Sequence, residues 1–207
     1  MPTSRLEAFS DGVLAIIITI MVLALPVPEG ETFGDLWRTT GPGLLTYVLS
    51  FVYVGIYWNN HHHLLHAVHQ VTGAALWANL HLLFWLSLLP LATAWMDSTA
   101  LARAPVLAYG VVLLACAGAF FVLQSRLLRA EGPDSAFART LEADAAGTTR
   151  KDRISLAGYL VGIVAVLLDA RAVPSPVGVT IALVAYVAVA LVWLVPDRRF
   201  ESVVRRR

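Results

Sequence analysis

The first 26 residues contain an apolar run that is long enough to cross a lipid bilayer as a helix. The run follows Arg5 and Glu7 and ends at Pro26. About 20 apolar residues in a helix span the ~30 Å hydrocarbon core of a bilayer. Because a signal peptide has a shorter, uncharged apolar region, we expect a retained membrane helix. Asp11 lies inside this helix, where a carboxylate is costly unless it faces protein or water, so we interpret it as a functional residue.

The composition of the whole chain agrees with a membrane protein. Of its 207 residues, 58% are hydrophobic and 14% are charged, whereas soluble domains carry about 25% charged residues. The formal net charge of +1 gives no sign of nucleic-acid binding, and the one cysteine cannot form a disulfide within the chain. We predict an all-α integral membrane protein with one domain over residues 1–207. Its six predicted membrane spans are 4–26, 42–68, 72–96, 104–129, 153–170 and 174–195.

The basic residues of the loops predict how the chain lies in the membrane. If the N-terminus is inside, twelve of the 15 Lys and Arg residues lie on the cytoplasmic side. The three on the opposite side are Arg38, Arg103 and Arg171. Since cytoplasmic loops are enriched in Lys and Arg, we expect both termini in the cytoplasm.

Polar residues gather at the cytoplasmic ends of the first three predicted helices. Each of these groups needs a partner in an apolar interior, so we expect a layer of hydrogen bonds between the helices. Arg5 alone has a simpler alternative, since its side chain can extend to the lipid headgroups. Glu7 likewise suits a helix N-terminus. The polar residues of this layer are Arg5, Ser10, Asp11, Asn59, Asn60, His61, His62, His63, His66, His69, Trp77, Asn79 and His81.

Three of the histidines have the spacing of metal ligands. His62, His66 and His69 stand at positions i, i+4 and i+7, on one face of a helix. Zinc sites usually add a thiolate or carboxylate, and residues 57–96 contain no Asp, Glu or Cys. We therefore expect no metal site and no bound cofactor, with these imidazoles hydrogen-bonded or solvated at the membrane surface.

A stripe of aliphatic residues with a single hydroxyl runs along the first predicted helix. Gly12, Ile16, Thr19 and Leu23 follow helical spacing, and Ile20 lies beside them. Ordinary helix packing explains such a stripe well. A pore lining is the alternative, because aliphatic rings can gate by dewetting and a hydroxyl can partly replace the water around an ion.

Short motifs in the first three predicted helices resemble the signature of the transmembrane protein 175 family. The first helix carries Arg5 followed by Phe9, Ser10 and Asp11. The second contains Tyr-Trp-Asn-Asn-His-His at 57–62, and the third contains Trp-Ala-Asn-Leu at 77–80. The resemblance covers about the first 95 residues, whereas the last three helices match the family in number and hydrophobicity alone.

This resemblance implies a potassium channel that has no P-loop filter. Prokaryotic members have one six-helix unit and assemble as tetramers, which implies a homotetramer in the plasma membrane of a prokaryote. The first helix of each chain would line the pore, with a hydrophobic constriction at Ile16, Ile20 and Leu23. Thr19 would supply the hydroxyl layer that is associated with potassium preference. The motif and inter-helix network would comprise Arg5, Phe9, Ser10, Asp11, Trp77, Asn79 and one of the three consecutive histidines at 61–63, of which we favour His62.

The expected activity is passive conduction of potassium ions, favoured modestly over sodium, and not enzymatic catalysis. One alternative is a secondary transporter or metal permease that depends on His62, His66 and His81. A second alternative is a membrane scaffold that does not conduct, in which the polar layer only holds the helices together.

Overall fold

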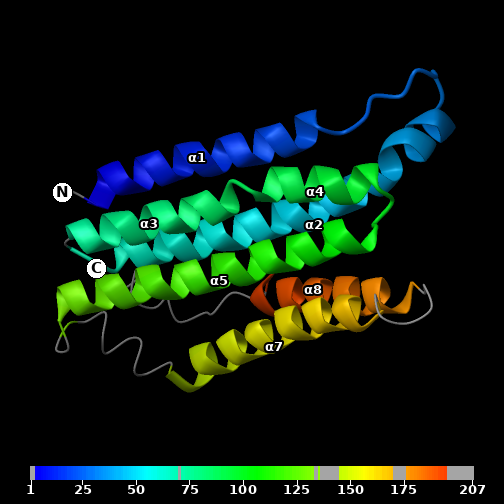
Figure 1. The fold of residues 1–207 in the computed structure, drawn as a ribbon. Coiled ribbons are helices and arrows are strands. Elements are labelled where there is room, and N and C mark those ends of the chain that lie inside the picture. The colour runs from blue at the N-terminus through cyan, green and yellow to red at the C-terminus, as the bar shows by residue number, and fades with distance from the viewer. Residues whose placement is uncertain (1–2, 70, 133–134, 136–144, 170–175, 195–207) are drawn as a thin grey trace.

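The computed structural model describes residues 3–69, 71–132, 135, 145–169 and 176–194. Within these ranges the chain is helical and forms no strand, which confirms the prediction of an all-α protein. Figure 1 shows the helices as long rods whose axes run in broadly the same direction. They are α1 (Thr3–Leu23), α2 (Phe33–His66), α3 (Gly73–Leu86), α4 (Leu89–Ser98), α5 (Arg103–Glu131), α7 (Ala145–Asp169) and α8 (Val177–Leu194).

Helix α2 begins at Phe33, well before the expected start near residue 42. Thr32 caps the helix, since its hydroxyl accepts a hydrogen bond from the Asp35 backbone N–H at 3.1 Å. The Asp35 carboxylate in turn accepts from the Thr32 backbone N–H at 3.1 Å. This reciprocal capping box satisfies two N–H groups that a helix start otherwise leaves unpaired. Pro42 is therefore inside the helix and does not mark its start.

The predicted third span, 72–96, is two helices and not one. Helix α3 ends at Leu86, and α4 begins at Leu89 with Pro90 in its first turn. A proline has no backbone N–H and its ring clashes with the preceding turn, so a continuous helix is interrupted there. Residues Gly73–Ser98 taken together are still long and apolar enough to cross a membrane.

The remaining helices follow the prediction more closely. Helix α5 differs from the predicted span 104–129 by only a few residues, whereas α7 starts earlier than the predicted 153. The predicted ends of the last span, at 174 and 195, lie outside the described residues. By length and composition, α1, α2, the α3–α4 pair, α5 and α8 are suited to cross a membrane. Helix α7, which covers most of the predicted span 153–170, is not among these candidates within the described residues, and it contains the charged residues Asp152, Arg153 and Asp169.

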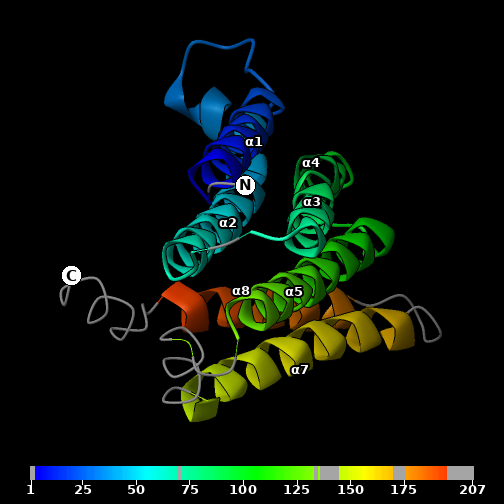
Figure 2. The same ribbon diagram turned by 90° about the vertical axis from the view of Figure 1, so that its left-hand side faces the viewer.

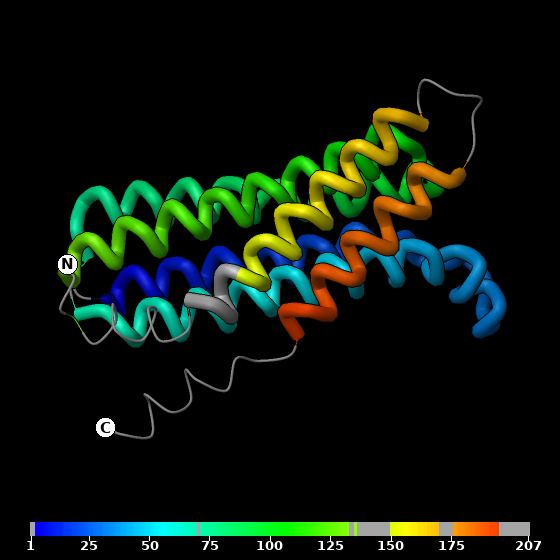
Figure 3. Tube along the Cα trace, turned by 90° about the horizontal axis from the view of Figure 1, so that it is seen from below, coloured from blue at the N-terminus to red at the C-terminus, as the bar shows by residue number. Residues whose placement is uncertain are grey.

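The helices form two groups that meet at α5. Helix α1 packs on α2, α3 and α4, while α7 and α8 pack on each other and on α5. Figure 2 shows α1 and α2 on one side of the bundle and α7 with α8 on another. Seen from below in Figure 3, α7 and α8 run alongside each other across the α1–α2 pair.

A cluster of four tyrosines fills the junction of α2, α5, α7 and α8. The rings of Tyr53, Tyr109, Tyr159 and Tyr186 are spaced with centroids 6.0 to 6.5 Å apart. The Tyr53 hydroxyl donates a hydrogen bond to the Tyr186 carbonyl oxygen at 2.7 Å. Gly110 lets the Tyr186 ring approach α5, because a Cβ at that position would lie 1.9 Å from the tyrosine oxygen. These contacts hold the α7–α8 pair against the remainder of the bundle.

Candidate functional site

Helix α1 has one face buried in the chain and one face that the chain does not cover. The buried face comprises Leu6, Ser10, Leu14, Ile17 and Met21. On the opposite face, Ile16 is 58% exposed, Ile20 is 50% exposed and Leu23 is 82% exposed. The stripe singled out in the sequence is therefore not used for packing within one chain. Its aliphatic side chains are left for lipid, another copy of the chain or a pore.

Thr19 is the one hydroxyl-bearing residue of this exposed stripe. Its Oγ1 donates a hydrogen bond to the Ile16 carbonyl oxygen at 2.9 Å. Since the proton is used within the helix, the lone pairs of the oxygen are the part of the hydroxyl that can face outward. The Thr19 side chain thus presents an acceptor, the type of group that replaces water around a cation.

A chain of buried hydrogen bonds joins α1, α3 and α2 at one end of the bundle. The Ser10 hydroxyl donates to the Leu6 carbonyl oxygen at 2.9 Å and accepts from Asn79 Nδ2 at 3.0 Å. The Asn79 Oδ1 atom accepts from His61 Nε2 at 2.7 Å. Ser10, Asn79 and His61 are all buried. These hydrogen bonds, the buried link, connect α1 to α2 and α3. Buried polar groups have lost their contact with water, so they need partners of this kind within the protein.

Asp11 has a different partner from the rest of this link. Trp58 Nε1 donates a hydrogen bond to Asp11 Oδ1 at 3.0 Å. The carboxylate is only half-buried, so it lies at the edge of the α1–α2 contact. This bond adds a second tie between α1 and α2.

The structure separates the other predicted network residues from the buried link. Arg5 and Phe9 are exposed, and Trp77 is 75% exposed. Within the part of the chain that the structure describes, the side chains of Arg5 and Trp77 make no hydrogen bond or ion pair. The histidine that bonds Asn79 is His61 and not its neighbour His62. His62 Nδ1 instead lies 2.8 Å from Glu7 Oε1.

Glu7 and Trp58 were missing from the sequence-based network, and His61 takes the place for which His62 was favoured. The helical spacing contains a signal for His61, which continues the buried stripe of Tyr53, Tyr57 and Leu64 on α2. The residue next to it on a helix is turned by about 100°, which places His62 on another face. Glu7 and Trp58 carry no such signal, because their contacts depend on how α1 crosses α2.

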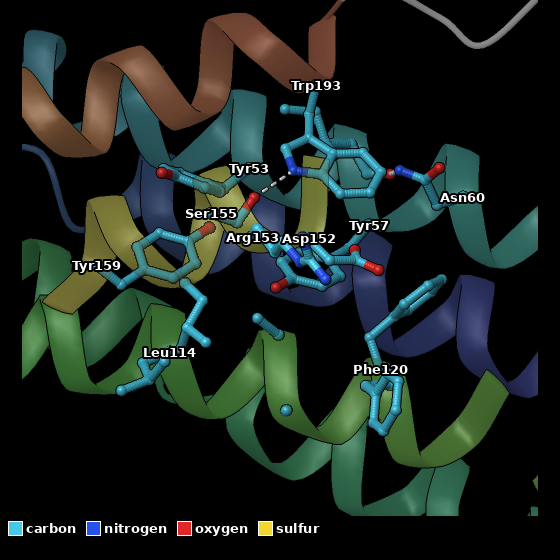
Figure 4. Close-up of a pocket in the computed structure, with 15 residues that line it drawn as sticks. Tyr53, Tyr57, Asn60, Leu114, Phe120, Asp152, Arg153, Ser155, Tyr159 and Trp193 are labelled. Carbon is cyan, nitrogen blue, oxygen red and sulfur yellow. Dashed lines mark hydrogen bonds between the residues drawn. The ribbon is translucent and has the colours of Figure 1, made fainter. Parts of the chain in front are cut away.

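The structure also has a cavity of about 430 Å³ between α2, α5, α7 and α8. Figure 4 shows Tyr57, Tyr159 and Trp193 around it, with the Trp193 indole donating a hydrogen bond to the Ser155 hydroxyl at 2.7 Å. Asp152 is at its exposed rim, where nearby apolar atoms partly desolvate the carboxyl and raise its pKa. No α1 residue lines this cavity, so it is separate from the uncovered stripe.

Comparisons with known proteins place this arrangement in a family. Residues 5–90 match the family model described as the endosomal/lysosomal potassium channel TMEM175. A potassium channel of Chryseobacterium sp. (strain P1-3) is 47% identical over 98% of this chain and 97% of its own length. The human endosomal/lysosomal proton channel TMEM175 is 36% identical over 49% of this chain and 22% of its own length.

A solved structure has the same fold. The crystal structure of a lysosomal potassium-selective channel TMEM175 homolog from Chamaesiphon minutus matches with a TM-score of 0.66 and 25% identity. The match covers 92% of this chain and 97% of the solved chain. These relatives are ion channels and not enzymes. The chain is therefore a multi-pass membrane protein that belongs to the TMEM175 family of potassium channels.

Proposed function

We propose that this protein is a passive potassium channel, modestly selective over sodium, whose pore is lined by α1 from each of four identical chains. The observation that carries the proposal is the uncovered face of α1, with Ile16, Ile20 and Leu23 exposed in a single chain. In a member of a channel family, four such faces around an axis would form a narrow, water-poor constriction. Aliphatic rings of this kind gate by dewetting.

Thr19 gives this constriction a chemical preference for cations. A potassium ion that enters the narrow segment loses part of its hydration shell, and four Thr19 oxygens would compensate some of that loss. Potassium is favoured because its dehydration costs less than that of sodium. Few ligands of this type provide weaker discrimination than a ring of backbone carbonyls, so the selectivity is modest.

Hydrogen bonds near the start of α1, one buried and one at the edge of the α1–α2 contact, support this helix in the mechanism. Ser10 and Asp11 tie the helix to Asn79 and Trp58, on two different neighbours. Opening of the pore would move the far part of α1, near Leu23, relative to this fixed end. The network therefore positions the pore helix and does not itself contact the ion.

We place the protein in the plasma membrane of a prokaryote, with the supported end of α1 toward the cytoplasm. In Figure 1 this end of the bundle holds the start of α1, the end of α5 and the start of α7, whose sequences contain Arg5, Arg129 and Arg153. The opposite end holds the starts of α2 and α5, which contain Arg38 and Arg103. This distribution favours the same orientation as the loop charges.

The test is ion flux from liposomes that contain the purified protein, with potassium, sodium and protons compared separately. Leu23→Ala is expected to raise potassium flux or sodium leak by about tenfold, equivalent to about 1.4 kcal/mol in the barrier. The control is Leu168→Ala, which removes an exposed leucine on α7, at 59% exposure against 82% for Leu23. It should conduct like the parent protein.

Other outcomes would reject the proposal in distinguishable ways. Equal flux through Leu23→Ala and Leu168→Ala in folded protein would remove α1 from the pore. Saturable flux that is lost in His62→Ala would favour the histidine-dependent transporter, whereas silence in all variants would favour the scaffold. A proton current without potassium current would assign a different permeant ion.

A further inference from the structure

Glu7 and two histidines form a compact cluster where the start of α1 meets the end of α2. Glu7 Oε1 lies 2.8 Å from His62 Nδ1 and 3.4 Å from His66 Nδ1. The two imidazole rings have centroids 4.1 Å apart, and one ligand atom from each of the three residues lies within 4.8 Å of the others. All three side chains are partly open to solvent, with exposed fractions of 20%, 37% and 48% for Glu7, His62 and His66. The cluster can therefore be reached from water.

Two imidazoles and one carboxylate are a donor set suited to a divalent transition metal. Zinc binds such nitrogen and oxygen ligands at about 2.0–2.2 Å and often keeps one further position for water. The facing Nδ1 atoms and the Glu7 oxygen are already close enough for small side-chain rotations to bring them around one ion. The positions of His62 and His66, one helical turn apart, place both imidazoles on the same side of α2.

The missing carboxylate was the reason to expect no metal from the sequence. Residues 57–96 contain none, but α1 brings Glu7 to the histidines across 55 positions of sequence. Three other histidines have partners outside the cluster: His61 bonds Asn79, His69 contacts Glu131, and His81 accepts a hydrogen bond from the Trp85 indole at 2.9 Å. The donor set is therefore Glu7, His62 and His66, and differs from the i, i+4, i+7 series read from the sequence.

We propose that Glu7, His62 and His66 form a binding site for a divalent transition-metal ion of the zinc class. Because the ligands come from two helices, the bound ion joins the start of α1 to the end of α2. The site is separate from the buried Ser10–Asn79–His61 link, which uses other atoms and another face of α2. It rests on the ligand geometry alone and does not depend on how ions permeate.

The experiment is a cobalt titration of the purified full-length protein in detergent, after removal of any polyhistidine tag. Bound Co²⁺ reports its ligand geometry in its visible absorption, and Zn²⁺ should displace it. We expect one ion per chain in the parent protein. Glu7→Gln and His66→Ala should each weaken binding by at least about tenfold, since even changes outside the ligand set reduce metal affinity by 10–100-fold.

His81→Ala is the matched control, because it removes a histidine of α3 that lies outside the cluster. It should bind cobalt like the parent protein. A second measurement is thermal unfolding with and without Zn²⁺. An ion that binds only the folded state raises the unfolding temperature, so the increase should occur in the parent protein and in His81→Ala but not in Glu7→Gln or His66→Ala.

Two results would overturn the proposal: no stoichiometric binding to the parent protein, or equal binding by Glu7→Gln, His66→Ala and the parent. If one variant fails to fold without metal, the other decides. Binding is read without any flux measurement, so a protein that binds cobalt but conducts no potassium would retain this site and reject the proposed pore.

Discussion

The Asn79 side chain of α3 joins three helices by hydrogen bonds, because it donates to Ser10 of α1 and accepts from His61 of α2. Buried amides of this kind give little net stability when paired, but leave costly unpaired groups when they are removed. Other polar residues of the predicted network are exposed, and removing them leaves no buried group without a partner. Arg5 and Trp77 look equally important in the sequence, yet neither is buried.

Asn79→Leu should therefore lower the free energy of unfolding by about 1–3 kcal/mol, since Ser10 and His61 keep buried groups without partners. Trp77→Ala, on the same helix, is the control and should change stability much less, because its side chain is 75% exposed. Thermal unfolding of both variants in one detergent provides the comparison. Equal losses in the two variants would show that the buried link does not hold α1.

At the scale of helices, the apolar runs predicted five of the segments that are long and apolar enough to cross a membrane, but not where each helix begins or breaks. Hydropathy locates apolar residues, whereas the start of α2 depends on the polar pair Thr32 and Asp35. The break between α3 and α4 depends on Pro90, inside a run that is otherwise suited to one helix. The choice of His61 over His62 depends on the rotation of α2 against α3, which a row of three histidines does not specify.

The contact of α5 with the α7–α8 pair gives a prediction at this scale. Gly110→Ala would place a methyl group against the Tyr186 hydroxyl and force the tyrosine cluster apart. Overpacking of this kind costs about 1–3 kcal/mol. Gly118→Ala, on the same helix, meets no atom within 4 Å, and should be neutral or slightly stabilising, since alanine favours a helix by about 1 kcal/mol over glycine.

The unfolding midpoint of Gly110→Ala should thus fall below that of the parent protein, whereas that of Gly118→Ala should stay level or rise slightly. A Gly110→Ala protein as stable as Gly118→Ala would mean that Tyr186 moves away at no cost. In that case the tyrosine cluster would not be the joint between the two groups of helices.

For the whole molecule, the sequence predicted a helical membrane protein, and the structure confirms it within the described residues. Whether chains assemble, and how many do so, does not follow from the fold of one chain. It depends on surfaces such as the exposed face of α1, whose partners lie outside a single chain. Leu23 looks like a packing residue in the sequence and is 82% exposed in the structure, so only an assembly or lipid can cover it.

The proposed homotetramer has a direct test in native mass spectrometry of the detergent-solubilised protein. Four chains of 22.4 kDa would give a closed ring of about 90 kDa, as expected for symmetric oligomers. Ile16→Lys would place four like charges around the proposed axis and should shift the population toward smaller species. Val164→Lys, on an exposed face of α7, is the control. A monomer in the parent protein would contradict the ring.

Helix α2 is longer than the membrane requires, and this has a consequence for what surrounds the protein. Its 34 residues form a rod of about 51 Å, whereas a bilayer core is ~30 Å thick. In Figure 1 its first turns, and the segment that joins it to α1, extend past the ends of the other helices. A soluble molecule that approaches from that side would meet this raised rim before it reached the apolar stripe of α1. Among the described residues, this rim is thus a surface that an antibody or toxin could bind without entering the membrane.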